Sequence, residues 1–232
     1  ERVKRYSRGL VLKNEQPENI VEEMLSLWKK LEGHKLPVEK RKILFVGEEI
    51  SFASRYRVEH FREQLILRGY ASRFIQMDQA EKESLEEYEA IVLYRCSKLM
   101  EVEMLADRAK AAGIRVYYDI DDLVFDYEKI AGLHFLKGKE YSDFRTTAER
   151  IHGCMEFCDG YITSTETLAG VIREEFPGKP IVINRNCMSM EMEVLSHEAS
   201  EQTDKNEEKI YIGYLSGSRT HDQDFAQVES AL

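Results

Sequence analysis

Residues 90–120, AIVLYRCSKLMEVEMLADRAKAAGIRVYYDI, place a helical pattern between two short apolar runs. The first run, AIVLY, and the last, IRVYYDI, are typical of strands buried on both faces. Between them, Val102, Leu105 and Ala109 recur at helical spacing, and Gly113 stands where a helix C-terminal cap belongs. A buried strand, a helix and a second buried strand predict one βαβ unit of a parallel sheet.

The same alternation continues on both sides of this unit. Four more short segments are expected to be strands, at 43–47 (ILFVG), 72–76 (SRFIQ), 160–163 (GYIT) and 180–183 (PIVI). Strands that lack a polar alternation and are separated by helices form a parallel sheet covered on both faces. The sequence therefore predicts an α/β fold with a Rossmann-like doubly wound parallel sheet over residues 43–195.

Several polar residues are expected to start the helices between these strands. Ser54 and Asp143 precede apolar residues at helical spacing, as N-cap residues do. Thr163 and Glu166 have the spacing of a capping box ahead of another helix. The acidic stretch 81–89 is expected to include one further short helix.

The regions that flank this domain differ from it in composition. Residues 1–42 form an N-terminal segment with an amphipathic helix expected over 18–32. Residues 196–208 (SHEASEQTDKNEE) are expected to be a solvated linker, because Ala199 is their only apolar residue. Residues 209–232 then restart the alternation with the run IYIGYL, which predicts the beginning of a second α/β domain. We therefore expect the chain to be part of a longer polypeptide whose remainder completes that domain.

Charge and cysteine content exclude several classes of protein. The chain carries 33 Lys and Arg against 43 Asp and Glu, a formal net charge of −10, which argues against a nucleic-acid partner or an anionic membrane bound through overall charge. No apolar run approaches the roughly 18 residues of a membrane span. The four cysteines form no CxxC pair and no Cys/His set at zinc spacing. No zinc site is therefore expected from the cysteines, and reduced thiols fit a cytoplasmic protein.

The sharpest candidate site is the run Asp119-Ile120-Asp121-Asp122. Ligands of an open parallel sheet bind outside the carboxyl ends of its strands, and these carboxylates lie at such an end. Like charges this close repel one another. They are either solvated, paired with Arg or Lys, or used as a base or a ligand, and we expect a functional role for Asp119, Asp121 and Asp122.

Other expected strand ends contribute further candidate side chains. Ser54 and Arg55 lie at a strand-to-helix turn, where a helix N-terminus and a guanidinium favour anions. Arg55 is preferred there over Arg57, which could equally lie on the outer face. Arg95 follows the third strand and either neutralises the aspartates or contacts substrate. Asn186 follows the sixth strand, where an asparagine suits a turn or a sugar hydroxyl.

A second turn with hydroxyl and basic side chains opens the expected second domain. Its candidate residues are Ser216, Gly217, Ser218, Arg219 and His221. Backbone amides of such a turn, placed between a strand and a helix, can cradle a phosphate. The turn matches no Walker A pattern, and no GxGxxG fingerprint occurs at the first strand-to-helix turn.

Taken in order, these segments resemble the N-terminal half of bacterial GT-B glycosyltransferases of group 1 (GT4-like). The resemblance covers about residues 43–232 and is carried by SRYRVEHFREQLILRGY (54–70), IVLYRC (91–96), AAGIRVYYDIDDLVFD (111–126), CDGYITSTETLAGVI (158–172), PIVINRN (180–186) and IGYLSGSRTHDQDF (212–225). It implies two Rossmann-like domains that face each other. The first would bind the acceptor, and the second would bind a nucleotide-sugar.

The resemblance also implies residue roles. Asp121 and Asp122 stand where many relatives have a His-Asp pair that faces the reacting sugar, and Asn186 matches an asparagine that ends the last strand of the first domain. Ser216, Gly217 and His221 match the loop beside the donor diphosphate, and an acidic E-x7-E motif would lie beyond residue 232. The implied reaction transfers a sugar to a hydroxyl of a glycan or lipid-linked acceptor and needs no metal or other cofactor. This chain alone would not complete the active site.

Three other functions are left open at this point. The string YYDIDDLV resembles the hhhDxD motif of haloacid-dehalogenase-like phosphatases, although three strands precede it here. Asp119-x-Asp121 also fits the metal-binding DxD of GT-A transferases, although the second α/β start does not. A non-catalytic glycan-binding or scaffolding module of a larger synthase is the third. The implied acceptors leave association with a membrane surface or a synthase complex open.

Overall fold

The computed structural model describes residues 42–48, 52–130 and 139–202. The expected helix over 18–32 and the expected second domain at 209–232 lie outside the described residues. Among the helices that are described, none is both long and apolar enough to cross a membrane.

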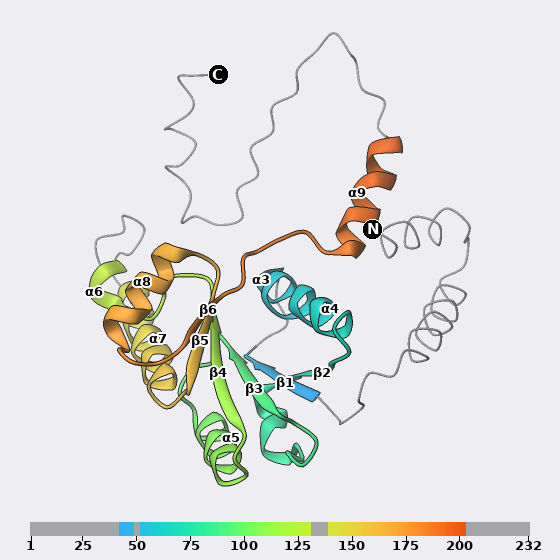
Figure 1. The fold of residues 1–232 in the computed structure, drawn as a ribbon. Coiled ribbons are helices and arrows are strands. Elements are labelled where there is room, and N and C mark those ends of the chain that lie inside the picture. The colour runs from blue at the N-terminus through green and yellow to red at the C-terminus, as the bar shows by residue number, and fades with distance from the viewer. Residues whose placement is uncertain (1–41, 49–51, 131–138, 203–232) are drawn as a thin grey trace, which may run out of the picture.

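The centre of the fold is a six-stranded, all-parallel sheet with the strand order β2-β1-β3-β4-β5-β6 (Figure 1). The strands are β1 (Lys42–Gly47), β2 (Ala71–Gln76), β3 (Ala90–Tyr94), β4 (Arg115–Ile120), β5 (Gly160–Thr163) and β6 (Ile181–Ile183). All six were expected from the apolar runs, and each lies within one residue of its expected bounds. The predicted Rossmann-like doubly wound α/β fold is confirmed.

Helices cover both faces of this sheet. They are the continuous segment α3 (Phe52–Ser54), η1 (Arg55–Glu59) and α4 (His60–Ile66), then η2 (Met77–Lys82), α5 (Met100–Ala111), α6 (Tyr127–Ile130), α7 (Lys139–Glu156), α8 (Glu166–Glu175) and α9 (Met190–Gln202). The η1 turn is π-helical, and η2 is a 3-10 helix. Gly113, at φ +72, follows the end of α5 as expected of a C-terminal cap.

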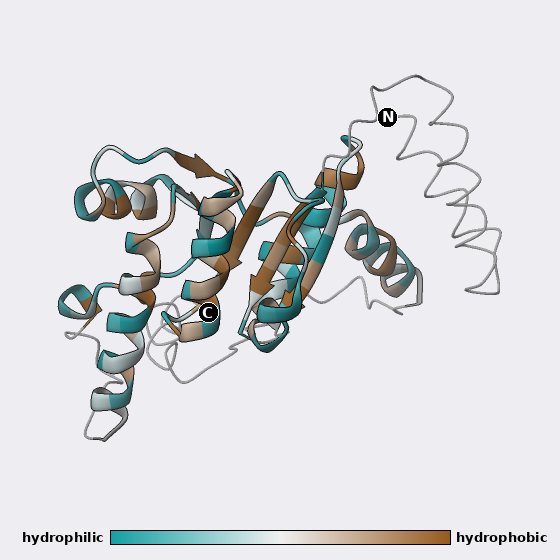
Figure 2. Cartoon of the chain, turned by 90° about the horizontal axis from the view of Figure 1, so that it is seen from below, coloured by the Kyte–Doolittle hydropathy of each residue, from teal (hydrophilic) through white to brown (hydrophobic). Residues whose placement is uncertain are grey.

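The core therefore consists of two apolar layers, one on each face of the sheet. Leu44 and Leu93 belong to the layer that packs against α5, α7 and α8. Phe45 and Val92 belong to the other layer, which packs against η1 and α4. Figure 2 shows the strands mainly hydrophobic, whereas the helices alternate between hydrophobic and hydrophilic residues. The alternation of side chains along each strand assigns neighbouring residues to opposite layers.

Two of the expected helix starts are wrong. One helix begins before the expected cap residue Ser54, and strand β5 extends through the other, Thr163. Ser54 has helical φ and ψ (−62 and −26), since the helix already begins at Phe52, and it makes no side-chain cap. Thr163 remains within β5. The N-cap of α8 is instead Thr165, which has an extended backbone and accepts a hydrogen bond from the Leu168 amide at 3.2 Å.

Three other helix boundaries also differ from expectation. α7 begins at Lys139, so Asp143 lies inside the helix and does not start it. The short helix expected within 81–89 is wrong in its position, because residues 83–89 are not helical and the nearby η2 (Met77–Lys82) reaches this stretch only at its last two residues. α9 continues to Gln202, so the first part of the expected linker 196–208 is helical, and 203–208 lie outside the described residues.

Candidate functional site

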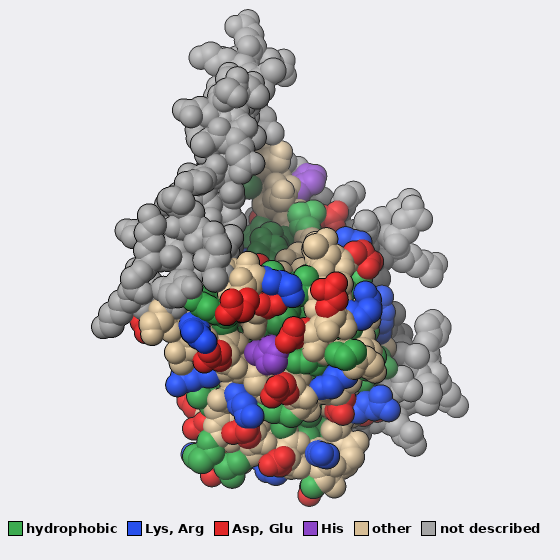
Figure 3. Space-filling view, turned by 90° about the vertical axis from the view of Figure 1, so that its left-hand side faces the viewer, with side chains coloured by type: hydrophobic (Ala, Val, Ile, Leu, Met, Phe, Trp, Pro, Cys, Tyr) green, Lys and Arg blue, Asp and Glu red, His purple; other side chains and the backbone are tan. Residues whose placement is uncertain are grey.

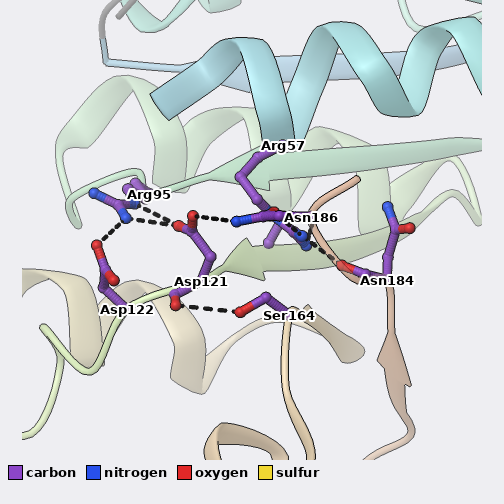
Figure 4. A network of polar contacts seen from close by, with 8 residues as sticks. Arg57, Arg95, Asp121, Asp122, Ser164, Asn184 and Asn186 are labelled. Atoms are coloured by element: carbon purple, nitrogen blue, oxygen red, sulfur yellow. Dashed lines mark hydrogen bonds and ion pairs between the residues drawn. The ribbon is translucent and has the colours of Figure 1, made fainter. Parts of the chain in front are cut away.

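The carboxyl ends of the strands gather a polar network on one edge of the sheet (Figure 4). The chain runs outward from β1 to β2 and then returns to β3, so the strand order reverses between β1 and β3. Ligands of open α/β sheets bind outside the carboxyl ends at such a reversal. Arg95 follows β3, Asp121 follows β4, Ser164 follows β5 and Asn186 lies three residues beyond β6.

A buried ion pair lies at the base of this network. The Arg57 guanidinium donates to both carboxylate oxygens of Asp119, from Nε to Oδ1 at 2.8 Å and from Nη2 to Oδ2 at 2.9 Å. The side chains are 0% and 1% exposed. Tyr118 and Ile120 belong to the layer under α5 and α7, so Asp119 between them faces η1, which carries Arg57.

The burial of Asp119 changes its acidity. Burial raises the pKa of the Asp119 carboxyl to about 6, and the charge and hydrogen bonds of Arg57 act in the opposite direction. At pH 7 the carboxyl is therefore mainly ionised and the bidentate pair is intact.

Arg57 also holds the chain that follows β6. Its Nη1 donates to the Asn184 carbonyl at 2.5 Å and to Oδ1 of Asn186 at 3.0 Å. The expected preference for Arg55 over Arg57 is wrong, because Arg57 is fully buried and bonded to the network whereas Arg55 is exposed. The signal that could have found Arg57 is its spacing of four from Phe61, a residue packed against the core.

A second arginine organises the carboxylates at the surface of the network. Arg95 donates to Oδ1 of Asp121, from Nε at 3.0 Å and from Nη2 at 2.6 Å, and it also pairs with Asp122. The ion-pair role considered for Arg95 is thus present. The Asn186 amide lies 3.5 Å from Oδ2 of Asp121, and the Ser164 hydroxyl donates to the Asp121 carbonyl at 3.3 Å.

Two features at the end of β3 are unusual for a purely structural site. Tyr94 is 3% exposed, and its hydroxyl has no hydrogen-bond partner in the described structure. Burial raises the pKa of this hydroxyl well above its usual value. The next residue, Arg95, has φ +48, which is uncommon for a residue with a side chain. Unpaired buried polar groups and strained backbone both concentrate at functional sites.

The other predicted site residues are Ser54 and five residues of the turn that opens the expected second domain. Ser54 is buried within the α3–η1 segment. Ser216, Gly217, Ser218, Arg219 and His221 lie outside the described residues. In the part of the chain that the structure describes, no group of three or more His, Cys, Asp or Glu side chains could hold a metal ion.

Comparisons with known proteins do not assign this site. No protein-family model matches the chain, and no curated protein sequence matches it. The function must therefore be inferred from the residues and the geometry at the edge of the sheet.

One prediction concerns the thiols around the site. Cys96, Cys154 and Cys158 are buried and Cys187 is exposed, and all four are free. Burial also raises the pKa of Cys96 and of Cys154, which lowers their thiolate fraction. We expect Ellman's reagent to modify one thiol rapidly in the folded chain and all four in denaturant. Cys187→Ser should abolish the rapid phase, and a rapid phase that persists in this variant would contradict the burial of the other three.

Proposed function

We propose that residues 43–195 are the acceptor-side domain of a GT-B glycosyltransferase of the group 1 kind. In this proposal the complete protein transfers a sugar from a nucleotide-sugar to a hydroxyl of a glycan or lipid-linked acceptor. The observation that carries the proposal is the placement of Asp121 at the carboxyl edge of the sheet, held by Arg95 and Asn186. This is where the resemblance expects a side chain that faces the reacting sugar.

The hydrogen bonds of Asp121 suit a group that receives a hydroxyl proton. Oδ1 accepts both bonds from Arg95, whereas the contact described for Oδ2 is the long one to Asn186. A carboxylate oxygen has capacity for further donors, and 11% of this side chain is exposed. Asp121 would thus accept a hydrogen bond from the acceptor hydroxyl and act as its base. Asp122, 60% exposed, would help to hold Arg95 and contact the sugar.

The charge of the network favours a hydroxyl-bearing acceptor over a diphosphate. Two guanidinium groups, on Arg57 and Arg95, face the carboxylates of Asp119, Asp121 and Asp122. Counted by formal charge, two guanidinium groups and three carboxylates leave the network with one net negative charge. A donor diphosphate would be repelled here. It would be stabilised by Arg219, His221 and a helix N-terminus in the 209–232 region, with no metal or other cofactor.

The two metal-dependent alternatives would use the aspartates differently. Both would use the Asp119-x-Asp121 string, so Asp119 would have to be accessible to a metal ion or a substrate. The Asp119 carboxylate instead accepts from Arg57 through both oxygens and is 1% exposed.

The surface of the domain also gives no reason to add a nucleic-acid partner, because acidic and basic side chains are interspersed on the face shown in Figure 3.

A transfer assay tests the proposal. We expect the complete polypeptide that contains residues 1–232 to release a nucleoside diphosphate from one member of a nucleotide-sugar panel, only when a hydroxyl acceptor is present. Glycan binding without turnover would favour the non-catalytic module instead. Magnesium-dependent phosphate release from phosphomonoesters would favour the phosphatase. The proposed donor places the protein in the cytoplasm, and a lipid-linked acceptor would place it at the inner face of the membrane.

A further inference from the structure

One helical surface holds the chain that follows β6. Three side chains of the continuous η1–α4 segment bond to residues 184–190, which run from β6 past this segment into α9 (Figure 1). Besides the Arg57 contacts given above, His60 Nδ1 lies 2.8 Å from the Cys187 carbonyl, and the Glu63 carboxylate accepts from the Met190 amide at 3.0 and 3.2 Å. We call residues 184–190 the post-β6 segment.

One surface of the η1–α4 segment makes all of these bonds. His60 and Glu63 lie three residues apart in α4 and so share one side of that helix. Arg57, in the π-helical η1 turn, is placed beside them by its bonds to the same post-β6 segment. The groups they bind are mainly backbone carbonyls and an amide, which need partners because an irregular segment satisfies few of them itself. The three side chains therefore replace the hydrogen bonds that a neighbouring strand would supply.

Within the post-β6 segment, Asn186 links the buried arginine to the candidate site (Figure 4). Its Oδ1 accepts from Arg57, which has only donors. Its Nδ2 consequently points to Oδ2 of Asp121, which has only acceptors when ionised. Arg57 thus determines which end of the amide faces the carboxylate, although Arg57 itself is fully buried and cannot touch a ligand in the solvent.

We propose that Arg57 is a positioning residue that orients the Asn186 amide, and through it the Asp121 carboxylate, while the Arg57, His60 and Glu63 surface holds the post-β6 segment as one unit. The role of Asp121 in this inference rests on the proposed function, but the orientation of Asn186 does not. Arg57 therefore has two separable tasks, which are to neutralise Asp119 in the core and to fix the position of Asn186.

Arg57→Lys separates these tasks. A lysine keeps the positive charge opposite Asp119, but a single ammonium cannot reproduce the fork that reaches Asp119, the Asn184 carbonyl and Asn186 together. The matched control is Arg62→Lys, an exchange on the same helical segment whose arginine bonds to Glu59 and Ser72. Both variants are made in the chain of residues 1–232 and studied by ¹⁵N-edited NMR.

We expect the side-chain amide protons of Asn186 to exchange with water about tenfold faster in Arg57→Lys, since loss of a hydrogen bond to a charged group changes an equilibrium by at least that factor. Their chemical shifts should also move, whereas Arg62→Lys should leave both quantities as in the original chain. Unchanged Asn186 signals in a folded Arg57→Lys variant would overturn the proposal and leave Arg57 as the counter-charge of Asp119 alone.

Glu63→Ala tests whether the post-β6 segment is held as one unit, and it leaves the buried ion pair of Arg57 and Asp119 unchanged. This variant therefore still tests the proposal if Arg57→Lys does not fold. We expect the backbone amides across residues 185–190 to exchange faster together. Faster exchange at Met190 alone would contradict a segment held as one unit. Neither NMR outcome depends on sugar transfer, so failure of the proposed function and failure of this inference are distinguished.

Discussion

Replacing Asp119 by alanine should lower the free energy of unfolding by about 3–5 kcal/mol, the usual effect of removing one partner of a buried ion pair. The remaining guanidinium of Arg57 would be buried without a counter-charge, since its other partners are the neutral carbonyl of Asn184 and amide of Asn186. Urea unfolding followed by circular dichroism measures the change. This loss is large for a domain whose total stability is on the order of 5–15 kcal/mol.

Two further variants show that the loss comes from the unpaired charge. Glu59→Ala removes a half-exposed partner of Arg62 on the same helical segment and should cost less than about 1 kcal/mol. The double variant Arg57→Met with Asp119→Leu removes both charges, so it should be more stable than Asp119→Ala. The recovery should be partial, because this variant also loses the bonds of Arg57 to Asn184 and Asn186. A cost below about 1 kcal/mol for Asp119→Ala, or a double variant less stable than the single one, would contradict this account.

The strands could be read from the sequence because burial on both faces leaves short continuous apolar runs. AIVLY and GYIT match β3 and β5 residue for residue. The helix starts were harder, because two threonines near the end of β5 both suit a cap. The choice between Thr163 and Thr165 depends on how far β5 pairs with its neighbours, which involves residues distant in the sequence.

The location of the candidate site could be predicted from the sequence, but the pairing of its side chains could be predicted only in part. Topology alone placed Asp121, Arg95 and Asn186 at the carboxyl edge of the sheet, because the ends of parallel strands meet there. The buried position of Arg57 was missed, since arginine is rarely buried without a partner and that partner, Asp119, lies 62 residues away. The alternation Tyr118-Asp119-Ile120 was a signal that went unused, because it places Asp119 on the opposite face of the sheet from its two neighbours.

In the complete protein, Asp121→Asn should lower the rate of the proposed sugar transfer by about 10²–10⁴-fold, the range that a general base contributes. The amide keeps the size of the carboxylate but cannot take a proton from the acceptor hydroxyl. The fold should be retained, because Arg95 keeps Asp122 as its partner and Asp121 takes no part in the buried pair of Arg57. The measurement is kcat and KM from nucleoside diphosphate release.

The matched control for this variant is Asp107→Asn, which changes an exposed aspartate on α5 and should leave kcat unchanged. If Asp121 is the base, kcat should fall in Asp121→Asn while KM changes little. If the side chain only binds the acceptor, KM should rise while kcat stays close to that of the unmodified protein. Activity within tenfold of the unmodified protein would remove Asp121 from the mechanism and, with it, the observation on which the proposed function depends.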